Sequence, residues 1–120
     1  MTDNHNDRKD LNIFDREDAL TRFMGDEQLL ETLLDGYIVE IESQIGSLYD
    51  ALKEENAKSS AIALHTIKGC AANMSAEELR VTSKRLEGKV KENKFSEVMD
   101  SFEELEDTFT RLKQVIRQHS

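Results

Sequence analysis

The chain has 120 residues, a length suited to a single domain with one hydrophobic core of moderate size. Charged residues make up 34% of it and hydrophobic residues 38%, with no Pro and no Trp, which is typical of an all-helical protein with charged outer faces. The formal net charge of −9 argues against nucleic acid or a membrane as a partner, because both are bound through basic surfaces.

Several other classes of protein are also disfavoured. No apolar run approaches the roughly 20 residues of a membrane span, and the polar residues 1–10 do not resemble a signal peptide. The single cysteine excludes an intramolecular disulfide framework. These features together predict a cytoplasmic protein.

Residues 1–11 are rich in Asn and Asp and are expected to be a disordered lead-in, whereas residues 12–118 are expected to form one domain. A short helix should begin after Asp15 as its N-cap and end at Gly25. Its apolar side is formed by Phe14, Ala19, Leu20 and Phe23.

Asp26 is expected to cap a long second helix that runs to about Lys53. Apolar residues recur along it at steps of three and four, which predicts one buried face. This seam consists of Leu30, Leu34, Tyr37, Ile41, Ile45, Leu48 and Leu52, and it is widened by Leu29, Leu33 and Ile38.

A polar turn over residues 54–58, with Asn56 as a cap, leads into a third helix that runs to about Met74. Ser75 is predicted to be the next N-cap, with Glu78 completing a capping box. The fourth helix should turn four residues inward and end near residues 92–94. These inward residues are Leu79, Thr82, Leu86 and Val90.

The last predicted helix starts at Phe95 and has the most regular apolar seam, with steps that alternate between three and four. The seam consists of Phe95, Val98, Phe102, Leu105, Phe109, Leu112 and Ile116. The sequence therefore predicts an all-α fold: an antiparallel up-down-up-down four-helix bundle with an additional short N-terminal helix.

His65 stands out in the third helix because it lies one step off the apolar seam and should point to solvent. Gly69 in mid-helix costs roughly 1 kcal/mol relative to Ala, which suggests close approach of another group to the backbone there. The expected surface neighbours of the imidazole are mostly small, with one ammonium group: Ala61, Ile62, Lys68, Gly69 and Ala72.

The stretch His65-Thr66-Ile67-Lys68-Gly69, followed by Cys70-Ala71-Ala72-Asn73, resembles the His-x-x-Lys-Gly core of the histidine-containing phosphotransfer (HPt) domains of bacterial phosphorelays. Flanking segments are also similar to that family, and the resemblance covers roughly residues 13–116. It implies that His65 accepts a phosphoryl group from a receiver-domain aspartate and passes it to another receiver aspartate.

The resemblance also implies roles for other residues. Lys68 and Gly69 would stabilise the phosphoryl group, and a residue of the fourth helix would help to frame it, the candidates being Lys84, Glu87 and Lys91. Partner docking would involve the small and apolar surface around the histidine, namely Ala61, Ile62, Ala72, Phe23 and Met24.

The same resemblance implies a phosphocarrier rather than an enzyme, because the chain has no glycine-rich phosphate loop and no ATP-binding segment. No cofactor is expected on this chain, since Mg²⁺ would belong to the partner receiver. The three scattered histidines have no metal-ligand spacing. Expected partners are response-regulator receiver domains, a hybrid sensor kinase, or both.

Three alternatives remain at this stage. The bundle could be an adaptor that binds receivers or kinases without accepting phosphate, or a dimerisation domain cut from a histidine kinase. It could also be a structural bundle with a coincidental motif. Four long helices in one chain favour a monomer over the dimerisation domain. The sequence does not name the pathway, the direction of phosphate flow or the ring nitrogen that is phosphorylated.

Overall fold

The structure is a computed structural model that describes residues 11–118. Within that range every regular element is a helix, and residues 11–13 form a helical turn before the first named one. The helices are α2 (Arg16–Arg22), α3 (Glu27–Lys53), α4 (Ala57–Asn73), α5 (Glu77–Lys91), α6 (Phe95–Asp100) and α7 (Phe102–Gln118).

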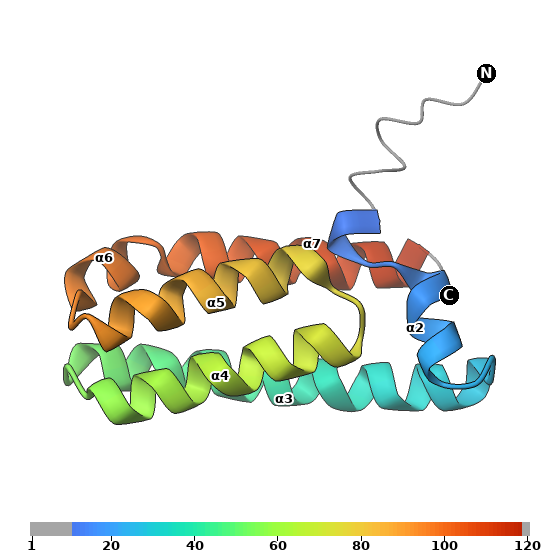
Figure 1. The fold of residues 1–120 in the computed structure, drawn as a ribbon, viewed down its shortest axis with the longest axis horizontal. Helices are drawn as coiled ribbons and strands as arrows, with labels where there is room; N and C mark the ends of the chain where they lie inside the picture. The colour runs from blue at the N-terminus through green and yellow to red at the C-terminus, as the bar shows by residue number, and fades with distance from the viewer. Residues whose placement is uncertain (1–10, 119–120) are drawn as a thin grey trace, which may run out of the picture.

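Four long rods form the bundle: α3, α4, α5 and the pair α6–α7 (Figure 1). Successive rods run in opposite directions, α4 packs between α3 and α5, and α2 crosses the end of the bundle where α3 begins. The predicted antiparallel up-down-up-down bundle with a short N-terminal helix is therefore confirmed.

The core consists of the apolar seams that the spacing predicted. Residues from every rod are almost fully buried, among them Leu30, Ile41, Leu48, Leu64, Ile67, Met74, Leu79, Leu86, Leu105 and Leu112. Leu29 is an exception to the predicted α3 face. It is 42% exposed in the first turn of α3, whereas the next residue, Leu30, is 1% exposed.

Three predicted N-caps are present. The carboxylates of Asp15 and Asp26 accept hydrogen bonds from the backbone N–H groups three residues on, each at 3.0 Å, and the Asn56 side chain does the same at 3.0 Å. Each cap satisfies a backbone donor that a helix start leaves without an intrahelical partner. These caps fix where α2, α3 and α4 begin.

The prediction that Ser75 caps α5 is wrong. Ser75 lies in the left-handed region at φ 59°, and the N-cap position is Ala76, which makes no side-chain cap. The Ser75 hydroxyl instead donates to Asp18 Oδ2 at 2.6 Å, and the Ser75 carbonyl accepts from the backbone N–H of Asp15 at 3.0 Å. The turn between α4 and α5 is thus bound to α2, a long-range contact that local sequence does not reveal.

The prediction of one unbroken last helix is also wrong, because Ser101 separates α6 from α7. Its ψ is close to 0°, and its N–H lies 3.1 Å from the carbonyl oxygens of both Glu97 and Val98. The apolar spacing does not detect this break, since Val98 and Phe102 both stay buried on either side of it.

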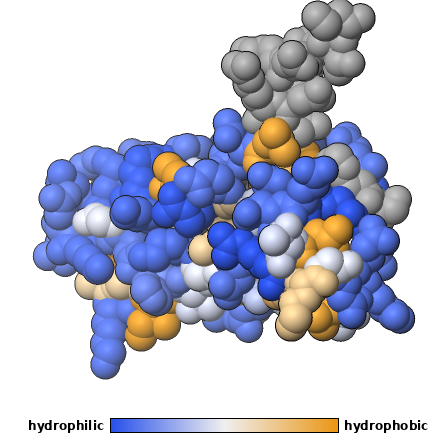
Figure 2. Space-filling model, turned by 45° about the vertical axis from the view of Figure 1, so that its right-hand side comes forward, coloured by the Kyte–Doolittle hydropathy of each residue, from blue (hydrophilic) through white to orange (hydrophobic). Residues whose placement is uncertain are grey.

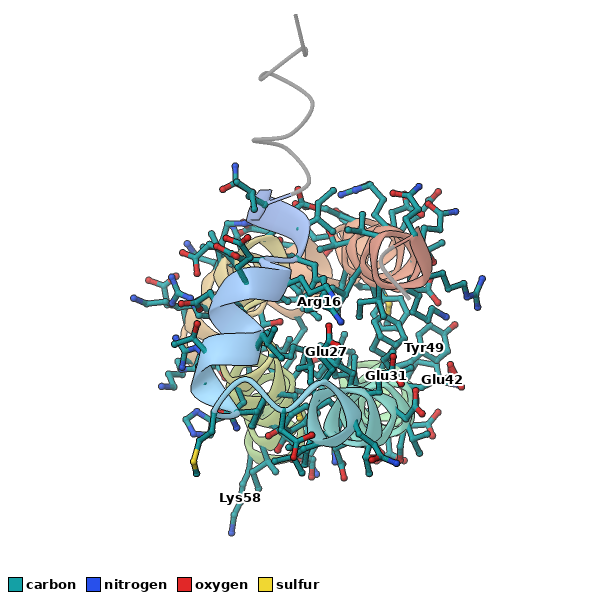
Figure 3. The ribbon with its side chains drawn as sticks, turned by 90° about the vertical axis from the view of Figure 1, so that its right-hand side faces the viewer. Arg16, Glu27, Glu31, Glu42, Tyr49 and Lys58 are labelled. Carbon is teal, nitrogen blue, oxygen red and sulfur yellow. The ribbon has the colours of Figure 1, made fainter. Side chains whose placement is uncertain are left out.

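Helix α2 and the residues just before it are held to the bundle by buried and charged side chains. Phe14 is 2% exposed, and Arg16 forms an ion pair with Glu27 at 3.2 Å across the end of the bundle (Figure 3). Of the predicted disordered lead-in, residues 1–10 lie outside the described residues, and residue 11 is helical. Among residues 11–118, no helix is both long and apolar enough to span a membrane.

Candidate functional site

His65 lies in the middle of α4 and points away from the core, as its sequence position predicted. Its side chain is 70% exposed, whereas the preceding Leu64 is fully buried. One residue corresponds to a rotation of about 100° around a helix, so burial of Leu64 directs the imidazole outward. The ring is held on a rigid helix and is accessible from outside.

Glu87 of α5 is the residue that meets this histidine. Its side chain is only 8% exposed, and three basic groups surround the carboxylate. Lys68 Nζ lies 2.8 Å from Oε1, His65 Nδ1 lies 3.3 Å from Oε2, and Lys91 Nζ lies 3.5 Å from Oε2. Because α4 and α5 are antiparallel neighbours, the two α4 residues and the two α5 residues form one cluster.

Two opposing effects act on the pKa of Glu87. Burial, the largest single influence, raises it, but the hydrogen bond from Lys68 and the positive charges of Lys68, Lys91 and His65 together lower it. The net result is a pKa below the usual value for glutamate. The carboxylate is therefore ionised at neutral pH and acts as an acceptor.

The contact with Glu87 orients the imidazole ring. An ionised carboxylate can only accept hydrogen bonds, so the 3.3 Å contact between Glu87 Oε2 and His65 Nδ1 favours the tautomer with the proton on Nδ1. In the neutral ring the lone pair then belongs to Nε2, on the side of the ring turned away from Glu87. The arrangement presents an oriented nucleophilic nitrogen to solvent.

The space beside the histidine is open. Apart from its chain neighbours and the nearby backbone of α4, a Cβ placed on Gly69 would meet no atom of the described residues within 4 Å, so packing against the rest of the bundle does not require glycine there. Lys84 is exposed, and within residues 11–118 it forms no ion pair, unlike Lys68 and Lys91. Of the three α5 candidates, Glu87 and Lys91 thus belong to the cluster, whereas Lys84 lies outside it.

The predicted docking residues differ in how much surface they offer. Ile62 is 56% exposed and Met24 is 91% exposed, whereas Ala61, Ala72 and Phe23 are half-buried. The expectation that Phe23 and Met24 belong to the short helix is wrong, because α2 ends at Arg22 and both lie in the turn that follows. Figure 2 shows exposed apolar side chains gathered mainly towards the end of the bundle that α2 crosses.

The cysteine of the chain has no direct part in this cluster. Cys70 is buried, and burial together with the nearby Glu40 raises the pKa of its thiol, so it behaves as a core residue. Among the described residues, no group of His, Cys, Asp and Glu side chains is arranged to hold a metal ion.

The chain is thus a four-helix bundle that presents an exposed imidazole, His65, beside the ammonium group of Lys68. The chain belongs to the Hpt domain family, whose model matches residues 32–115. No curated protein matches the sequence.

Solved structures share the fold. Histidine-containing phosphotransfer protein B (HptB) from Pseudomonas aeruginosa PAO1 is 23% identical, with a TM-score of 0.81 over 89% of this chain and 93% of that one. The HPT domain of an Hpt sensor hybrid histidine kinase from Shewanella is 17% identical, with a TM-score of 0.69 over 90% of this chain and 97% of that one.

Proposed function

We propose that this protein is a phosphorelay intermediate that accepts a phosphoryl group on His65 from a receiver-domain aspartyl phosphate and passes it to another receiver aspartate. The observation that carries the proposal is the contact of an exposed imidazole with a buried carboxylate: the His65 side chain is 70% exposed and its Nδ1 lies 3.3 Å from Glu87 Oε2, which leaves Nε2 as the nitrogen without this contact. Membership of the Hpt domain family supports it, because the proteins of this family are phosphocarriers rather than kinases.

The transfer step follows from this orientation. The lone pair of Nε2 attacks the phosphorus, the bond between phosphorus and the aspartyl oxygen breaks, and the carboxylate of the donor leaves with that electron pair. The positive charge that develops on the imidazole is stabilised by the Glu87 carboxylate, whose Oε2 lies 3.3 Å from Nδ1. Reversal of the same step on a second receiver returns His65 to its starting state.

Lys68 and Gly69 complete the histidine side of the transfer. The Lys68 ammonium is held 2.8 Å from Glu87, one turn from His65, where it can partly neutralise an incoming phosphoryl group. Lys91 supplies a second positive charge at the same carboxylate. Open space at Gly69 lets the phosphoryl group and its carrier approach α4 closely.

The partner would supply the rest of the chemistry. In this proposal, Mg²⁺ is bound by the receiver and stabilises charge on the transferring group, and this chain needs no cofactor of its own. The receiver would dock over His65 on the surface formed by Ala61, Ile62, Ala72, Phe23 and Met24. The proposal treats the protein as a cytoplasmic monomer, and sedimentation at micromolar concentration tests its oligomeric state.

A transfer assay tests the function. Receiver domains from the same genome are phosphorylated with radiolabelled acetyl phosphate and mixed with the wild type or with His65→Gln, whose exposed side chain makes a folding defect unexpected. We expect label on the wild type alone, labile in acid and stable in base as phosphohistidine is. Label retained by His65→Gln would refute the site, and receiver binding without any label would favour the adaptor function.

A further inference from the structure

The face that carries His65 is basic although the protein is acidic. The whole chain has 16 Lys and Arg residues against 25 Asp and Glu. Helices α4 and α5 reverse this balance, with seven Lys and Arg against three Glu, and α4 has no acidic residue. Positive charge is therefore concentrated on the two helices that build the site.

Within these helices the unneutralised charge lies close to the histidine. Lys58 is two turns before His65, and Lys84 is one turn before Glu87, so helical spacing places both on the outer side of the site. Neither forms an ion pair with any other group in residues 11–118, and the Lys58 side chain projects away from the bundle (Figure 3). We call Lys58, Lys68, Lys84 and Lys91 the basic rim.

The single acidic group at this site does not cancel the rim. Glu87 is 8% exposed and is shared by Lys68, Lys91 and the His65 ring. The other basic residues of α5 are each matched by a partner: Arg80 by Glu77, Arg85 by Glu104 and Lys89 by Glu97, all at 2.7 Å. Among the basic residues of α4 and α5, Lys58 and Lys84 are therefore the two without an acidic partner in residues 11–118.

We propose that the basic rim steers an acidic partner surface onto His65 and so sets the rate of encounter. The inference rests on the proposed function and specifies the partner: a receiver whose surface around the phosphorylated aspartate is negatively charged. Carboxylates that bind Mg²⁺ and an acyl phosphate give a donor site that character. Clustered charge of one sign accelerates association with an oppositely charged partner by ~10- to 1,000-fold, and salt removes the effect.

Charge reversal tests the steering. The double variant Lys58→Glu, Lys84→Glu is compared with Lys53→Glu, Lys113→Glu, which changes the net charge equally on α3 and α7. With any receiver that transfers phosphate, we expect the first variant to lower the second-order transfer rate roughly tenfold at about 0.01 M salt. At about 1 M salt the difference should disappear. The control variant should stay within about twofold of the wild type under both conditions.

A second measurement does not depend on phosphotransfer. Poly-L-glutamate is titrated into the isotopically labelled protein at low salt, and amide resonances are followed by NMR. We expect shifts confined to α4 and α5 in the wild type and lost in Lys58→Glu, Lys84→Glu. If these shifts occur but no receiver transfers phosphate, the proposed function is refuted, whereas the attraction of an acidic surface to α4 and α5 is supported. Absent or dispersed shifts, or transfer that is insensitive to salt, would overturn the inference.

Discussion

The ion pair between Lys68 and Glu87 gives a quantitative test of the site. Lys68 Nζ lies 2.8 Å from Glu87 Oε1, and the two side chains are 26% and 8% exposed. Fully exposed pairs contribute about 0.2–1 kcal/mol, whereas breaking a buried pair costs about 3–5 kcal/mol. Because one partner is buried and the other is partly hydrated, we expect a coupling free energy of about 1–2 kcal/mol.

The perturbation is a double-mutant cycle of Lys68→Met, Glu87→Gln and the combined variant. Lys68→Met keeps much of the apolar stem but leaves a buried carboxylate with only the more distant contacts to Lys91 and His65. We expect it to lower the free energy of unfolding by about 2 kcal/mol and the melting temperature by about 8 °C. The loss of unfolding free energy in the double variant should be smaller than the sum of the losses in the two single variants, because the double variant removes both charges of the pair.

Urea unfolding at neutral pH, followed by circular dichroism, provides the free energies for the cycle. The control is the same cycle on Arg85→Met and Glu104→Gln, a pair with a 2.7 Å contact whose side chains are 41% and 51% exposed. That cycle should give a coupling free energy of about 0.5 kcal/mol or less. A Lys68–Glu87 coupling below about 0.3 kcal/mol would show that their contact is an ordinary solvated pair and would refute the role assigned to burial.

Three further predictions concern transfer, pH and the attachment of α2. Lys68→Ala should slow phosphoryl transfer more than it weakens receiver binding, measured by rapid quench and titration; an unchanged transfer rate would remove Lys68 from the mechanism. Because folding lowers the pKa of Glu87, its stabilisation is complete above its unfolded value of about 4.3 and is lost as the pH falls through the folded value. The difference in unfolding free energy between wild type and Glu87→Gln should therefore shrink as the pH falls below about 4.3, and a difference at about pH 3 as large as at pH 7 would contradict this linkage. Phe14→Ala should cost about 3–5 kcal/mol in urea unfolding, since Phe14 is 2% exposed, and a loss below about 1 kcal/mol would show that this anchor is dispensable.

Sequence alone predicted the bundle and most helix starts because these features depend on local patterns. Seams at steps of three and four identify the buried face of each helix, and Asp15, Asp26 and Asn56 cap the helices that directly follow them. The solvent-facing position of His65 follows from the same spacing. Each of these predictions needs only residues within one helix or its flanking turn.

The wrong predictions share a different origin. Ser75 has the sequence of an N-cap, yet its hydroxyl is bonded to Asp18, 57 residues away. Ser101 interrupts the last predicted helix although the apolar seam continues across it. The local change in hydrogen bonding breaks the helix but leaves the spacing of the buried side chains intact. Both outcomes depend on tertiary contacts or backbone geometry that apolar periodicity does not encode.

Glu87 was one of three candidates on the fourth predicted helix, and nothing in the sequence distinguished it from Lys84 and Lys91. It shares a helix face with Lys84 and Lys91, and a phosphate-binding role favours lysine over glutamate. The rotation of α5 is nevertheless set by burial of Leu86 and Val90, which are fully buried. Glu87 directly follows Leu86, so it lies at the edge of the packed face, whereas Lys84 and Lys91 lie roughly 40–60° further towards solvent.

The placement of an acid at that edge has a consequence for the chemistry. A lysine in place of Glu87 would face Lys68 and repel it, and it would offer His65 Nδ1 no acceptor. A buried carboxylate satisfies both requirements, and its two cationic neighbours keep it ionised. In the proposed transfer the acid would orient the nucleophile and retain Lys68, while the surrounding lysines would provide the charge that an incoming phosphoryl group and its acidic carrier meet.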